Sequence, residues 1–78
     1  MMPQLRFTEV VWRRLRKAGL TEQAVYDVVR DPERVIRRRD GITEYTGWGE
    51  GCRLIVFTDR PIEPLVVLNV VVIERSEP

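Results

Sequence analysis

The most constraining feature of this sequence is an apolar run near its end, Leu65 to Ile73, in which eight apolar residues surround Asn69. The run is too short to cross a membrane as a helix, and its valines and isoleucine favour a β-strand. Side chains alternate along a strand, which assigns Leu65, Val67, Asn69, Val71 and Ile73 to one face and Val66, Leu68, Val70 and Val72 to the other. The chain's own helices can cover one face. We therefore expect the run to be a central strand of a strongly twisted sheet or to form a subunit interface.

A chain of 78 residues forms one domain, near the lower limit of what a single core keeps folded, so dimerisation would add stability. The single cysteine, Cys52, has no partner for an internal disulfide, and a reducing environment is expected. The lack of histidine removes most zinc and haem ligand sets. Residues 1–6 show no apolar core of a signal peptide. We therefore expect a cytoplasmic protein without a metal, a cofactor or a membrane segment.

The net charge of +1 hides an uneven distribution of charged residues. Residues 1–39 carry ten Arg or Lys against five Asp or Glu, whereas residues 40–78 carry three against seven. Most of the basic side chains are arginines, whose planar guanidinium group suits phosphate recognition and also suits ion-paired solvent-exposed surfaces. The basic half is therefore compatible with RNA binding and with an ordinary solvated surface.

Two helices are predicted in the first half, at about residues 8–18 and 21–30. A threonine stands at the start of each as a candidate N-cap, Thr8 and Thr21, and apolar residues follow at helical spacing. Gly19 suits the left-handed conformation that often ends a helix, and the proline after Asp31 ends the second helix.

After Pro32 the apolar spacing changes from helical to alternating, which predicts four strands at about residues 33–39, 42–48, 52–58 and 65–74. Asp40-Gly41 is a typical signal of a type I′ hairpin turn, and residues 47–51 form a looser glycine-rich connection. Two helices followed by four strands predict an α+β domain, with both helices on one face of an antiparallel meander. In a meander the last strand lies at an edge of the sheet.

The order and spacing of several motifs resemble the bacterial domain-of-unknown-function family 4258, over residues 7 to about 73. The motifs are Phe7-Thr8, Arg14, Gly19-Leu20-Thr21-Glu22, Val25 and Asp31-Pro32-Glu33-Arg34-Val35. That family is similar in layout to the RelE/ParE-like and colicin-nuclease-like toxins, whose helices sit against an antiparallel sheet and whose active members cut RNA. The resemblance implies a RelE-like fold and a toxin-type function.

The chain departs from that family at two positions. Val10 stands where the family has a histidine, and Ala18 stands where it has an arginine before the glycine. Metal-free RNA cleavage needs a base, an acid and cations at the phosphate, and the only candidate bases are Glu9, Glu44, Tyr45 and Glu50. Whether the chain is an enzyme stays open. The family layout implies a site between the start of the first helix and the middle strands, with the candidate catalytic residues Glu9, Arg14, Tyr45 and Arg53.

Basic and aromatic side chains supply the candidate RNA contacts, because arginine binds phosphate and aromatic rings stack on bases. The residues of this kind are Arg13, Arg16, Lys17, Arg37, Arg38, Arg39 and Trp48. An arginine-rich strand is equally compatible with an edge that its charges protect against aggregation, and Trp48 with ordinary packing.

Two interpretations of function remain. The first is a toxin-type protein that binds RNA through its basic half, with an antitoxin-type protein as a further partner and metal-independent endoribonuclease activity left open. The second is a catalytically inert, homodimeric protein-interaction domain with Leu65 to Ile73 at the dimer interface.

Overall fold

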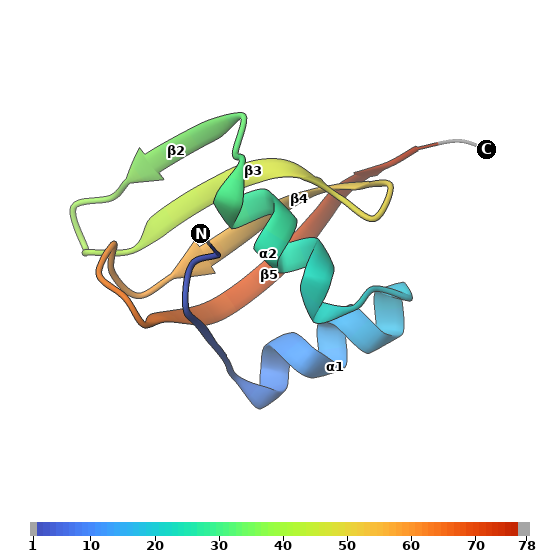
Figure 1. The fold of residues 1–78 in the computed structure, drawn as a ribbon, viewed down its shortest axis with the longest axis horizontal. Coiled ribbons are helices and arrows are strands. Elements are labelled where there is room, and N and C mark those ends of the chain that lie inside the picture. The colour runs from blue at the N-terminus through green and yellow to red at the C-terminus, as the bar shows by residue number, and fades with distance from the viewer. Residues whose placement is uncertain (1, 77–78) are drawn as a thin grey trace.

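Two helices cover one face of a five-stranded mixed sheet in the computed structural model, which describes residues 2–76 (Figure 1). In chain order the elements are β1 (Leu5–Phe7), α1 (Glu9–Ala18), α2 (Glu22–Arg30), β2 (Arg34–Arg37), β3 (Thr43–Gly49), β4 (Cys52–Thr58) and β5 (Leu65–Arg75). The predicted α+β class is confirmed, and the predicted helices agree with the observed ones to within a residue. Neither helix in residues 2–76 is long and apolar enough to span a bilayer.

The predicted four-stranded antiparallel meander is wrong in two respects. The sheet has a fifth strand, and its order is β1-β5-β4-β3-β2. β1 pairs in parallel with the start of β5, so that Leu5 lies opposite Leu65 and Phe7 opposite Val67. The first three residues of β5 therefore lie between β1 and β4 instead of at an edge, whereas the rest of β5 has no strand on the β1 side within residues 2–76. Because β1 has only three residues, its sequence shows too little alternation to reveal a strand.

Both helices begin at the predicted threonines, but neither hydroxyl caps its own helix. Thr8 Oγ1 donates a hydrogen bond to the Val67 carbonyl oxygen, 3.1 Å away, and links the start of α1 to β5. Thr21 donates its hydroxyl and, at 2.8 Å, its backbone N–H to the carboxylate of Glu50, which lies between β3 and β4. The negative charge of Glu50 thus lies at the positive N-terminal end of α2.

A tight two-residue turn joins β3 to β4. Glu50 and Gly51 have positive φ angles of 50° and 78°, and they connect the paired residues Gly49 and Cys52. Positive φ at both central residues is the geometry of a type I′ turn. The sequence predicts only a loose connection here, because glutamate is an unusual first residue for such a turn.

The predicted type I′ turn at Asp40-Gly41 is wrong. Gly41 has a positive φ of 90° but Asp40 does not, and the Asp40 carboxylate accepts a hydrogen bond from the loop backbone at 3.0 Å. β2 ends at Arg37, so Arg38 and Arg39 lie in the loop and not on the predicted strand.

The core lies between the two helices and the face of the sheet that they cover. α1 packs on β5, and α2 packs on β3 and β4. The fully buried apolar residues are Val11, Ala24, Val25, Val28, Leu54, Val56 and Val67. α2 approaches β3 very closely at Gly49, where a Cβ atom would lie 2.3 Å from the Ala24 carbonyl oxygen.

Two irregularities in β5 change which of its side chains face the helices. The pairing of β5 with β4 skips Leu68 and, further along, Ile73. As a result Leu65, Val67, Val70 and Val72 face the helices, while Val66, Asn69 and Val71 face the other side. The predicted strict alternation is therefore wrong beyond Val67, because the extra residue at Leu68 inverts the faces as far as the second irregularity at Ile73.

Candidate functional site

The four candidate catalytic residues do not come together in one site. Tyr45 lies on the helix side of β3 and packs against the core, whereas Arg53 projects from the opposite side of the sheet. Glu9 is exposed on α1, where its carboxylate lies 2.9 Å from the Arg13 guanidinium group. Arg14, on the same helix, lines a cleft beside β5. The sheet and the length of α1 thus separate the groups that an acid–base mechanism would need side by side.

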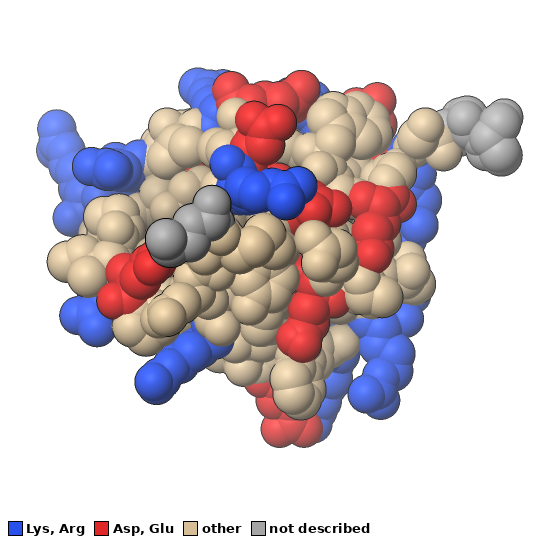
Figure 2. Space-filling model, in the orientation of Figure 1, with Lys and Arg blue, Asp and Glu red and all other residues tan. Residues whose placement is uncertain are grey.

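The basic candidate residues fall into two groups at different ends of the molecule. One group lies on α1, which packs on β5, and consists of Arg13, Arg16 and Lys17. The other lies at the end of β2, the strand at the opposite edge of the sheet, and consists of Arg37, Arg38 and Arg39. On the side that Figure 2 shows, basic side chains lie at separate places around the outline and near the middle, with carboxylates between them. The uneven charge of the sequence does not produce one continuous basic face.

The side of the sheet away from the helices, here called the open face, carries apolar side chains. Thr46, Ile55 and Val71 lie side by side across β3, β4 and β5. Around them are Ile36, Trp48, Phe57 and Val66. Both helices lie on the other side (Figure 1), so nothing in residues 2–76 covers these side chains, and Trp48 is 40% exposed.

Ion pairs border the open face. The Arg53 Nε atom lies 3.0 Å from a carboxylate oxygen of Glu33. Arg38 lies 2.8 Å from Asp40 and 3.7 Å from Glu44, which was one of the candidate bases. Arg34, opposite Thr46, and Arg6, opposite Val66, lie on the same side without an ion pair in residues 2–76. The open face therefore has an apolar centre and a charged rim that is only partly ion-paired.

In the part of the chain that the structure describes, no group of three or more His, Cys, Asp or Glu side chains is placed to bind a metal ion. Cys52 is buried in the core beneath the helices.

Comparison with known proteins gives no match, whether with family models, curated proteins or solved structures. The resemblance to family 4258 and to RelE-like toxins therefore stays a prediction. Function has to be inferred from the geometry of this chain.

Trp48 and Arg53 of the open face are among the predicted site residues, and Val66 and Val71 belong to the run predicted as a dimer interface, whereas Ile36, Thr46, Ile55 and Phe57 were not predicted. The signal for them is present in β4, where both sets of alternating positions are apolar. Leu54 and Val56 belong to the core, whereas Ile55 and Phe57 belong to the open face. A strand that is apolar on both sides indicates that both sides become covered.

Proposed function

We propose that this protein is a catalytically inert, homodimeric protein-interaction domain whose two copies meet through their open faces. The observation that supports the proposal is the uncovered row of Thr46, Ile55 and Val71, with Phe57 and Trp48 beside it. Apolar side chains of a sheet are stable when a second layer removes them from water. Residues 2–76 of one copy do not supply that layer.

The size of the open face suits a dimer. The molecule measures 36 by 26 by 25 Å, so one face is of the order of the roughly 800 Å² that each partner contributes to a stable interface. Its apolar centre and polar rim are the usual arrangement of such interfaces. A two-fold axis through this face would bring the same residues of both copies together.

Sedimentation equilibrium in the micromolar range tests the proposal. We expect the wild-type protein to sediment with about twice the 9.2 kDa mass of one chain. Ile55→Lys places a charge at the centre of the open face and should give a folded monomer, because the charge cannot be paired in the interface. Ile62→Lys is the matched control, since Ile62 is 64% exposed in the loop before β5, and it should leave the dimer intact.

A monomeric wild-type protein would contradict this proposal. Equal dissociation by Ile55→Lys and Ile62→Lys would contradict it as well, since the effect would then not be specific to the open face.

RNA binding by the loop after β2 is a second candidate function, which the resemblance to toxins also implies. Arg37 at the end of β2 and Arg39 in the loop are exposed, and neither pairs with a carboxylate within residues 2–76. If this loop binds phosphates, replacing Arg37, Arg38 and Arg39 with serine should weaken binding to all RNA sequences alike. The slope of log affinity against log salt should fall by about 0.7 per lost contact. If the triple variant bound RNA with unchanged affinity at low salt, the loop would not be part of an RNA site.

A further inference from the structure

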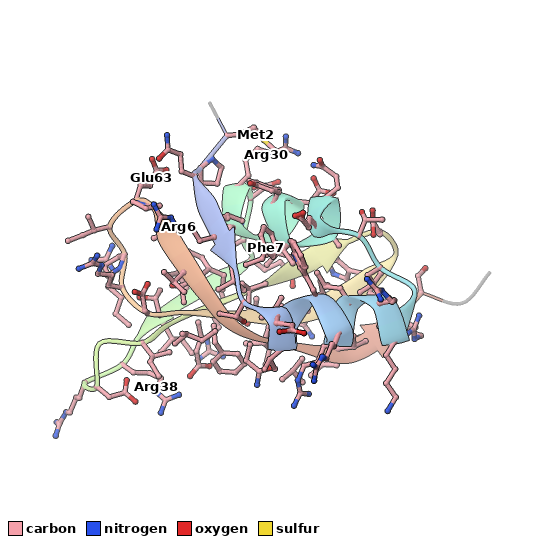
Figure 3. The ribbon with its side chains drawn as sticks, turned by 90° about the horizontal axis from the view of Figure 1, so that it is seen from below. Met2, Arg6, Phe7, Arg30, Arg38 and Glu63 are labelled. Atoms are coloured by element: carbon pink, nitrogen blue, oxygen red, sulfur yellow. The ribbon has the colours of Figure 1, made fainter. Side chains whose placement is uncertain are left out.

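Most of β5 has no neighbouring strand on one side. β1 pairs with only the first three residues of this 11-residue strand, and the last pair joins Phe7 to Val67. The chain then leaves the sheet to form α1, and the Thr8 hydroxyl binds the Val67 carbonyl oxygen. From Leu68 to Arg75, β4 pairs with one side of β5, and no strand within residues 2–76 pairs with the other. In Figure 3, β1 lies beside the start of β5 and α1 runs along the later part.

This free edge presents backbone hydrogen-bonding groups. In an antiparallel pair, alternate residues direct N–H and C=O toward the partner strand, and the residues between direct them away. The Val70 N–H donates to the side-chain Oδ1 atom of Asn69 at 2.9 Å, so the Val70 backbone faces away from β4. Because these directions alternate along a strand, the backbone N–H and C=O of Val72 also face away from β4. Asn69, the one polar residue of the apolar run, thus covers a backbone donor that would otherwise be unpaired at the edge.

A cleft of about 350 Å³ lies along the same edge, between β5 and α1. Its apolar lining consists of Leu15, Ala18, Leu20, Val70, Val71 and Val72. The Val70 N–H is held by Asn69, but the backbone of the partly exposed Val72 has no strand partner at this edge within residues 2–76. The cleft therefore combines an apolar wall with an unpaired strand edge, the two requirements for binding an extended peptide by strand addition.

The charged side chains of the cleft are all cationic. Arg14 and Lys17 line it from α1 and Arg75 lines it from the end of β5, whereas no Asp or Glu lines it. Arg75 donates a hydrogen bond to the Ala18 carbonyl oxygen at 2.8 Å. Within residues 2–76, none of these three cations is paired with a carboxylate.

We infer that this cleft binds an acidic peptide segment in an extended conformation, which adds a strand to the free edge of β5. The peptide backbone pairs with the partly exposed Val72, its apolar side chains contact Ala18, and its carboxylates pair with Arg14 and Lys17. This site is separate from the open face, so the inference does not depend on the proposed dimer.

Charge favours an acidic peptide over a second copy of this chain at the edge. Pairing two β5 edges about a two-fold axis would line up the same cations, Arg14, Lys17 and Arg75, from both copies along one junction. Like charges repel at such a junction. An acidic peptide brings the opposite charge to the same groups.

Fluorescence anisotropy with a capped, labelled hexapeptide of alternating glutamate and valine tests the inference. We expect saturable binding that weakens with salt, and no binding of the corresponding lysine-valine peptide. The double variant R14E/K17E should lower the affinity at least about tenfold, because both cations of α1 in the cleft are reversed. The matched control R13E/R16E makes the same charge change outside the cleft, on the same helix, and should change the affinity less than about twofold.

The same peptide with all its backbone nitrogens methylated tests strand addition on the unaltered protein, so the test stands even if R14E/K17E fails to fold. Methylation removes the N–H donors and keeps the carboxylates, and we expect binding to be lost. Equal binding of the methylated and unmethylated peptides would contradict strand addition.

Three other results would overturn the inference. Equal binding of the acidic and basic peptides would show that charge does not select the ligand. Binding of a single-stranded oligouridylate but not of the peptide, lost in R14E/K17E, would assign the cleft to RNA. Loss of dimerisation in R14E/K17E would assign the edge to a second copy of the chain.

Discussion

Gly49 sets the distance between α2 and the sheet. A Cβ atom at this position would lie 2.3 Å from the Ala24 carbonyl oxygen and 2.8 Å from the Ala24 Cα atom, and both belong to the backbone of α2. Gly47, two residues earlier on the same face, has ordinary room, since its Cβ would meet its nearest atoms at 3.5 Å. The close packing of α2 on β3 therefore requires glycine at Gly49 but not at Gly47.

Replacing each of these two glycines by alanine gives a matched pair of variants. We expect Gly49→Ala to lower the free energy of unfolding by about 2 kcal/mol or more, because α2 has to move away from β3. Gly47→Ala should change it by less than about 1 kcal/mol. Urea unfolding of both variants measures the difference, and equal stabilities of the two variants would show that the close approach is not needed.

The elements of this fold differ in how far local sequence determines them. Both helices can be predicted, because Thr8, Thr21 and Gly19 mark their ends and apolar residues recur at helical spacing between them. β1 and the bulge at Leu68 cannot be predicted in the same way, because they depend on a partner strand far away in the sequence. The turn at Glu50 is a similar case, since its residue type is selected by the contact with α2.

Glu50 joins the hairpin between β3 and β4 to the N-terminus of α2, and its charge should stabilise that helix. We expect Glu50→Gln to lower the free energy of unfolding by about 1 kcal/mol, because a neutral amide interacts less strongly with the helix dipole and the Thr21 donors. The difference should shrink at high salt. Glu74→Gln, an exposed change on the side of the sheet away from both helices, is the control. Equal effects of the two changes in urea unfolding would contradict this role of Glu50.

At the scale of the whole molecule, the order of the strands decides which predicted residues meet. The basic first half of the sequence is divided between α1, which packs on β5, and β2 at the far edge, so its charges do not form one surface. Tyr45 and Arg53 lie on opposite sides of the sheet, because side chains alternate along each strand and the pairing register of β3 with β4 fixes which of them share a side. The need for a second covered face can be predicted, however, because β4 and β5 are apolar on both sides.

The most direct measurement is an isotope-filtered NOE experiment on a mixture of labelled and unlabelled chains at millimolar concentration, because it detects only contacts between copies. The proposed dimer predicts NOEs between copies at Ile55, Phe57, Val71 and the Trp48 indole, and none at Trp12, which is exposed on α1. A spectrum without such NOEs, or with NOEs confined to Trp12 and the rest of α1, would contradict the account.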